Sequence, residues 1–77
     1  MRKYDDAYRD KLAWLEEKLG TGYTTVPVVA QYILHVDAGT LRAIESFPVV
    51  FIGSRRKVPI DRLARWLTDL DYQKIQI

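Results

Sequence analysis

The chain of 77 residues is long enough for one compact domain, 1–77, and too short for two. Its apolar content of 48% is typical of a globular protein, and the absence of cysteine excludes disulfide bonds and thiolate metal sites. A domain of this size buries only about 60% of its unfolded surface, which leaves little room for a catalytic pocket beside a complete core and argues against an enzyme.

The net charge of +2 is unevenly distributed along the chain. Residues 1–20 contain five basic and five acidic side chains, whereas residues 42–66 contain six basic and two acidic ones. A local excess of positive charge is what binding to nucleic acid requires. No apolar run approaches the ~20 residues of a membrane span, and the N-terminus is acidic where a signal peptide is apolar. We therefore expect a cytoplasmic protein that does not bind membranes.

Residues 4–19 are predicted to form a helix. Gly20 follows the last apolar residue and provides a C-cap. The apolar side chains of this helix form one stripe along it, which is shorter than a coiled coil requires. We therefore expect the stripe to pack against the rest of the domain, with Trp14 at its margin. The stripe consists of apolar side chains at steps of three and four residues: Tyr4, Tyr8, Leu12, Leu15 and Leu19.

A second, short helix is predicted over residues 26–34. The β-branched residues of this region favour a strand, but Pro27 cannot donate to a sheet and is tolerated in the first turn of a helix. Thr25 fits the N-cap position. We expect Val29, Ile33 and Tyr32 to point inward.

Asp37 is a suitable N-cap for a third helix, over residues 38–46, whose Leu41 and Ile44 are expected to face the core. Pro48 ends this helix, because the residue before a proline is pushed out of the α region. Two short helices joined by a tight turn are typical of a helix-turn-helix, in which the second helix lies in the DNA major groove.

A β-hairpin is predicted next, with a strand over 49–52, a basic turn over 53–56 and a short return strand over 57–58. Apolar residues at helical spacing then predict a helix over 60–71. The tail 72–77 alternates polar and apolar residues, which fits a strand, a helix end or a surface for a partner.

Five segments carry a resemblance, and they follow one another between Tyr23 and Leu67. They are Thr25-Val26 with Val29-Ala30 and Tyr32, Asp37-Ala38-Gly39-Thr40-Leu41-Arg42-Ala43-Ile44, Phe47-Pro48, Ile52-Gly53-Ser54-Arg55-Arg56-Lys57-Val58-Pro59, and Asp61-Arg62-Leu63-Ala64-Arg65-Trp66-Leu67. In this order they resemble the excisionase family of small winged-helix DNA-binding proteins, which are relatives of the MerR-type regulators. The link from Leu34 to Asp37 is one residue longer than the Gly-Val-Ser type of turn that family members often have.

The resemblance implies a mainly α fold with a small β-hairpin, a winged helix-turn-helix core over 23–71. The N-terminal helix over 1–20 is longer than the family core demands and is an extra element of this chain, and a tail follows over 72–77. The resemblance also implies an excisionase, a protein that binds and bends attachment-site DNA and directs a tyrosine recombinase toward excision of a mobile element such as a prophage. The expected partners are double-stranded DNA, a tyrosine integrase and neighbouring copies on DNA, with no cofactor. The alternatives are a small winged-helix transcriptional regulator and a protein-interaction module that binds a partner through the stripe from Tyr4 to Leu19 or through the tail Ile75-Gln76-Ile77 and does not bind DNA.

Arg42 is the main candidate for reading bases. An exposed arginine on the second short helix can donate two hydrogen bonds to guanine or clamp a phosphate, whereas pairing with Glu45 or Ser46 is the structural alternative. Ala38 and Gly39 either allow a phosphate to approach the helix or are simply exposed. The hydroxyl of Thr25 is placed to touch a backbone phosphate, but helix capping alone is enough to explain it.

The hairpin tip is the strongest local signal for DNA. Its adjacent cations repel one another unless an anion is present, and an arginine gains from the negative potential of a narrow minor groove, although a solvated turn is the alternative. We expect a structural role for Arg65 through pairing with Asp61 or Asp69, and a turn position without metal for His35. The complete set of candidate DNA contacts is Thr25, Ala38, Gly39, Thr40, Arg42, Ala43, Ser54, Arg55, Arg56 and Lys57.

Overall fold

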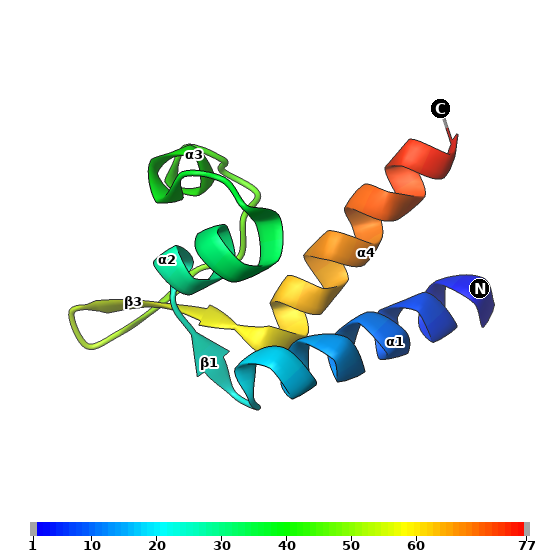
Figure 1. Ribbon diagram of the computed structural model, residues 1–77, viewed down its shortest axis with the longest axis horizontal. Coiled ribbons are helices and arrows are strands. Elements are labelled where there is room, and N and C mark those ends of the chain that lie inside the picture. The colour runs from blue at the N-terminus through cyan, green and yellow to red at the C-terminus, as the bar shows by residue number, and fades with distance from the viewer. Residues whose placement is uncertain (1, 77) are drawn as a thin grey trace.

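Two long helices, α1 (Arg2–Leu19) and α4 (Ile60–Gln76), pack against each other at the end of the molecule that holds both termini (Figure 1). The computed structural model describes the backbone of residues 2–76 and the side chains of residues 4–71. The short helices and a β-hairpin form the opposite end, and the hairpin extends from it as a thin arm. The fold is mainly helical with a small antiparallel sheet, which confirms the expected class at this level.

A single core joins the two ends. Almost every element contributes to it, and a fully buried aliphatic side chain stabilises the fold by about 1.5–3 kcal/mol relative to an exposed one. The buried apolar residues are Leu15, Val26, Val29, Ala30, Leu41, Phe47, Val58, Ile60, Leu63, Ala64 and Leu67.

Helix α1 confirms the prediction for residues 4–19 and begins two residues earlier. Leu15 of its stripe is fully buried, and Tyr8, Leu12 and Leu19 pack against the same core. The stripe is therefore covered by its own domain, largely by α4. Trp14 is partly exposed at the margin of the stripe, as expected.

The predicted helix over 26–34 is present but changes its winding. It consists of α2 (Val26–Val28) and η1 (Val29–Leu34), a π-helix in which hydrogen bonds span five residues instead of four. Thr25 takes the N-cap position with no capping bond from its hydroxyl, and Pro27 lies in the first turn. The prediction that Tyr32 points inward is wrong, because its side chain is 60% exposed.

The π-helix ends at His35, which adopts the left-handed conformation (φ 55°). The N–H groups of His35 and Val36 both donate to the carbonyl of Ala30, so one acceptor closes the widened last turn. His35 is exposed in this turn, as expected. The next helix begins only three residues after His35, at Ala38.

Helix α3 (Ala38–Arg42) begins where predicted but ends four residues before residue 46. After it the backbone tightens into turns of three residues, with Ile44 N–H donating to the Leu41 carbonyl and Phe47 N–H to the Ile44 carbonyl. These turns carry Phe47 into the core, where its ring meets Trp66 edge-on with centroids 5.0 Å apart. They also leave Ile44 37% exposed, so the prediction that it faces the core is wrong.

The sheet has three strands in the order β1-β3-β2. Strands β2 (Val50–Ile52) and β3 (Arg55–Pro59) form the predicted hairpin, but its turn contains only Gly53 and Ser54. The predicted turn was two residues too long, because Arg55 and Arg56 already pair across the ladder. Gly53 has φ 66°, the left-handed conformation that the first position of such a two-residue turn requires.

Strand β1 (Tyr23–Thr24) was not predicted, because two residues carry too little periodicity for a strand. It pairs with the end of β3, with Thr24 opposite Val58. Its position at the sheet edge leaves the Tyr23 side chain 55% exposed.

Helix α4 begins at Ile60 as predicted and continues to Gln76, beyond the predicted end at residue 71. The helix-end alternative for the tail is thus correct as far as Gln76, and Ile77 lies outside the described residues. No helix in the described part of the chain has a stretch long and apolar enough to cross a membrane.

Candidate nucleic-acid interface

An open hollow of about 380 Å³ lies between the β-hairpin on one side and, on the other, the end of α3 with the segment that follows it. One wall comes from residues 41–47 and the other from the hairpin, so the two elements that were expected to contact DNA line the same depression. Its lining residues are Leu41, Arg42, Ile44, Glu45, Phe47, Val49, Phe51 and Arg56. We refer to this depression as the hairpin hollow.

Two arginines from different walls line the hairpin hollow. Arg42 is the last residue of α3 and Arg56 lies on β3, and both side chains are exposed. Arg56 stands opposite Phe51 in the strand register, and its guanidinium carbon lies 5.6 Å from the centre of the Phe51 ring. This cation–π contact restricts the Arg56 side chain on the face of the hairpin that lines the hollow.

The electrostatic balance around the hairpin hollow is positive. Residues 38–59 contain four basic side chains and only one acidic side chain, Glu45. Among the described side chains, the only ion pair joins Lys11 and Asp71, in the two long helices. The cations of the hairpin and α3 thus form no ion pair with a described carboxylate. Glu45 lines the same hollow, but the four basic residues outnumber it, and such a surface attracts an anionic partner.

Alternation along the hairpin separates its two arginines. Residues directly opposite each other in an antiparallel ladder share a face, so Arg55 shares its face with Ile52, and Arg56 shares the other with Phe51. Only the second pair lines the hairpin hollow. The first pair flanks the turn at the far end of the arm.

The small residues at the start of α3, Ala38 and Gly39, are explained by the structure of the domain itself. Gly39 donates its N–H to the Asp37 carboxylate at 3.0 Å, so the predicted N-cap is confirmed and this N–H is not free for a phosphate. A β-carbon on Gly39 would lie 2.8 Å from the same carboxylate oxygen, so the glycine gives the cap its room. Ala38 packs partly against the core. Neither residue lines the hairpin hollow.

The other predicted contacts lie around the hollow rather than in it. Thr40 and Ala43 are exposed on α3 and just after it, Ser54 is exposed in the hairpin turn, and Lys57 is half-buried on β3. Thr25 lies at the start of α2 and is half-buried. Of the predicted set, the structure brings Arg42 and Arg56 into one depression.

Sequence reasoning missed the apolar part of this surface. Phe51 is 67% exposed, Ile52 is 50% exposed, and Ile44 and Val49 line the hollow together with Phe51. The run 49–52 was interpreted only as a strand. The available signal was its position beside a basic turn, because a hairpin that extends from a domain of this size exposes at least one of its faces.

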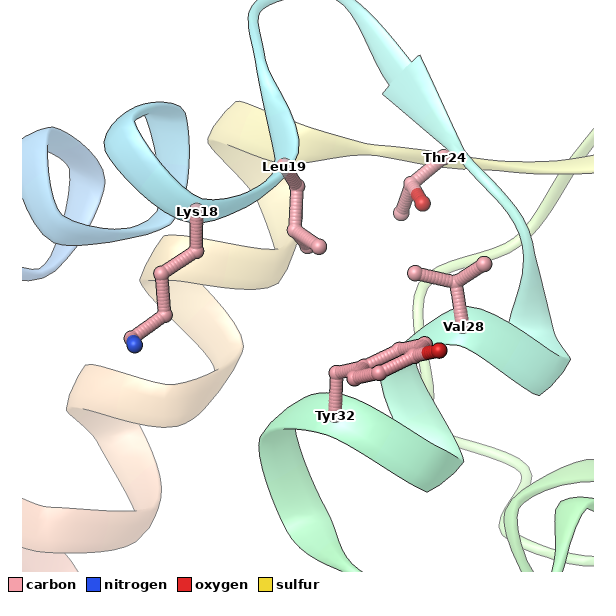
Figure 2. A pocket seen from close by; sticks show the side chains of 5 residues that line it. All are labelled: Lys18, Leu19, Thr24, Val28 and Tyr32. Carbon is pink, nitrogen blue, oxygen red and sulfur yellow. The ribbon is translucent and has the colours of Figure 1, made fainter.

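A larger open hollow, of about 650 Å³, lies between the end of α1, strand β1 and the α2–η1 helix (Figure 2). Lys18, Leu19, Thr24, Val28 and Tyr32 line it. In Figure 2, the side chains of Leu19, Thr24, Val28 and Tyr32 lie around a shared space, and the Lys18 side chain extends away from them. It offers one cation, and the Lys18 ammonium lies 5.4 Å from the centre of the Trp14 ring. With a single positive charge, this hollow is a poor site for a nucleic-acid backbone despite its size.

Several polar and charged side chains of the two long helices have partners within the domain. The Tyr4 hydroxyl donates to the Asp69 carboxylate, and this hydrogen bond raises the pKa of Tyr4 above its ordinary value. The Arg65 guanidinium carbon lies 5.0 Å from the centre of the Tyr8 ring. Arg65 thus contacts α1 as a structural residue, through the Tyr8 ring and the Tyr4 side chain, and forms no ion pair with Asp61 or Asp69, where we expected one.

Among the described residues, no group of three or more histidine, aspartate or glutamate side chains is close enough to hold a metal ion.

Comparisons with models of protein families, with curated proteins and with solved structures found no match to this chain.

Proposed function

We propose that this protein is a winged helix-turn-helix DNA-binding protein, in which α2–η1 and α3 form the helix-turn-helix and the β2–β3 hairpin is the wing. The observation that supports the proposal is the hairpin hollow, where Arg42 from α3 and Arg56 from the hairpin face a common depression. Arg56 on one wall can hold a phosphate of a strand that passes this depression, and Arg42 on the other wall can then reach the bases beside it. The exposed side of α3 then enters the major groove, and the hairpin tip reaches the adjacent minor groove.

The geometry also accounts for how contacts divide between the elements. Arg42 stands at the end of α3, where it can reach guanine O6 and N7 in the major groove. Arg56 is restrained by Phe51 beside the hollow and is suited to a phosphate. Arg55, Ser54 and Lys57 follow the arm toward its tip and add backbone or minor-groove contacts.

The protein-interaction alternative loses one of its two surfaces. The stripe from Tyr4 to Leu19 is covered, because Leu15 is buried and its neighbours in the stripe pack against α4 and the core. A partner helix cannot use that face without first displacing α4. The other surface, the side chains of the tail 75–77, lies outside the described residues.

Salt-dependent binding tests the DNA proposal. A fluorescently labelled random-sequence duplex is titrated with the protein at several salt concentrations, and each phosphate contact contributes about −0.9 to the slope of log K against log salt. If the three cations of the hairpin, Arg55, Arg56 and Lys57, all contact phosphate, the slope is about −3. The matched controls are Arg56→Gln and Arg9→Gln, which remove the same charge from the hollow and from an exposed site on α1.

Arg56→Gln is expected to make the slope shallower by about one, and Arg9→Gln to leave it nearly unchanged. A wild-type slope near zero would exclude the electrostatic mechanism. Equal effects of both variants would show that net charge matters and the hairpin hollow does not.

We further propose, from the resemblance, that the bound DNA is an attachment site and that the protein acts as an excisionase, bending the site so that a tyrosine recombinase excises a mobile element. The test is an excision assay with the integrase of the same mobile element. Stimulation of excision by the wild-type protein, and its loss in Arg42→Ala, supports this role. DNA binding without stimulation would favour a transcriptional regulator that uses the same surface.

A further inference from the structure

The tip of the β2–β3 hairpin carries apolar surface that the domain does not cover. Ile52 is 50% exposed and Phe51 is 67% exposed on an edge strand. Exposed apolar residues on an edge strand favour aggregation, and proteins normally replace them with charges or cover them. Here they lie next to Arg55 and Arg56 and directly before the turn.

The two apolar side chains have different surroundings. Phe51 lines the hairpin hollow and has the Arg56 guanidinium over its ring, so its role is to orient that arginine. Ile52 is absent from the lining of the hollow and pairs with Arg55 beside Gly53 and Ser54. Ile52 is thus an apolar side chain at the end of the arm, accompanied by a cation on the same face.

The charge of the arm determines which partner such a tip fits. Between Ser46 and Ile60 the chain has three cations, Arg55, Arg56 and Lys57, and no acidic residue. An apolar tip surrounded only by cations repels basic partners and matches a polyanion with apolar walls. The DNA minor groove has this combination, with phosphates on its rims and sugars and base edges inside.

We propose that Ile52 acts as a wedge that enters the minor groove beside Arg55, partly unstacks one base step and so bends the duplex. Minor-groove proteins insert isoleucine and similar residues in this way and kink DNA toward the major groove. This inference rests on the proposed function and adds a physical device for bending. The arginine draws the tip into the groove, and the isoleucine separates the bases.

Two duplexes of the same composition distinguish a wedge from an arginine contact alone. Alternating A·T sequence contains TA steps, which are flexible and easily unstacked, whereas an A-tract is stiff and has a narrow groove that attracts arginine. Each duplex carries a fluorescent adenine analogue whose emission rises when it unstacks. Binding is followed separately by fluorescence anisotropy from a terminal dye.

The wedge predicts that the wild-type protein binds the alternating duplex more tightly and raises the emission of the analogue there. Ile52→Ala is expected to bind while losing the rise in emission, and to shift its preference toward the A-tract because Arg55 remains. Ile52→Leu, which keeps an apolar tip, retains the emission change. Tyr32→Ala is the matched control, because it removes an exposed apolar side chain that lines the other hollow.

Because Ile52 is half-exposed, its truncation is not expected to unfold the domain, and circular dichroism of each variant verifies this. Binding by the wild-type protein with no rise in emission on either duplex, or an unchanged rise with Ile52→Ala, would overturn the wedge and leave the DNA-binding proposal standing. Failure to bind either duplex at low salt would overturn both.

Discussion

The two ends of this small domain differ in how far apolar side chains are buried and in whether polar side chains have partners. At the end formed by α1 and α4, apolar side chains such as Leu15 and Leu63 are buried, and the polar groups Tyr4 and Lys11 have partners on α4. At the end formed by α3 and the hairpin, Phe51 and Ile52 are exposed. There the described arginines have no ion-pair partner among the described carboxylates.

This difference shows how a domain of 77 residues combines stability with a binding surface. A short chain has few residues for a core, so apolar side chains left on its surface forgo burial energy. Here the arm carries two of the exposed apolar side chains, Phe51 and Ile52, while the packed end maintains the fold. Mutations at the two ends should therefore have different effects. Those at the packed end should lower stability, and those in the arm should lower binding.

The largest effect is expected from Leu15→Ala at the packed end. Leu15 is completely buried beneath α4, and truncation of a buried leucine costs about 2–5 kcal/mol. The free energy of unfolding is measured by chemical denaturation. Ile52→Ala is the comparison at the exposed end, where we expect a change of about 0.5 kcal/mol or less. Similar losses in both variants would contradict the division between the two ends.

Substitutions in the hairpin hollow are expected to change binding with little change in stability. Arg42→Ala should weaken binding to the cognate site by about 1–3 kcal/mol and binding to random sequence by less, because it removes a base contact. Arg56→Ala should weaken both to the same extent, because it removes a phosphate contact. Affinities for the two duplexes at one salt concentration provide the measurement. Parallel losses in the two variants would show that our division of roles is incorrect.

A smaller effect is expected where the two ends are joined. Trp66 on α4 donates its indole N–H to the Ser46 hydroxyl at 3.1 Å, and its ring packs against Phe47. Trp66→Phe keeps the aromatic packing and loses the hydrogen bond, for a cost of about 1 kcal/mol in the free energy of unfolding. A double-mutant cycle with Ser46→Ala isolates this bond, and additive effects would mean that it contributes nothing.

The smallest effect concerns Tyr4 at the packed end. Its hydrogen bond to Asp69 raises its pKa in the folded state, so the neutral phenol is the form that folding favours. The resulting stability is present below about pH 10, the pKa of an unfolded tyrosine, and is lost as the pH rises through the folded pKa. We expect the stability difference between wild type and Tyr4→Phe to stay constant up to about pH 10 and to shrink above that pH. A difference that is constant with pH would refute the contribution of this bond.

Helix positions could largely be predicted from the sequence, because the signals are local. The stripe of α1, the proline at the start of α2 and the Asp37 cap of α3 each depend on residues within a few positions of one another. The end of α3 could not be predicted, because Phe47 leaves the helix to reach Trp66, which lies nineteen residues away on α4. Strand β1 likewise exists only through its pairing with β3.

The candidate site shows the same division. The sequence by itself determined that cations gather at Arg42 and at the hairpin tip, since charge and turn residues are visible without a fold. Only the tertiary structure decided that Arg42 and Arg56 share one depression and that Arg55 and Ile52 share the other face of the arm. The physical reason is that a strand alternates its side chains between two faces, and long-range packing alone determines what each face meets.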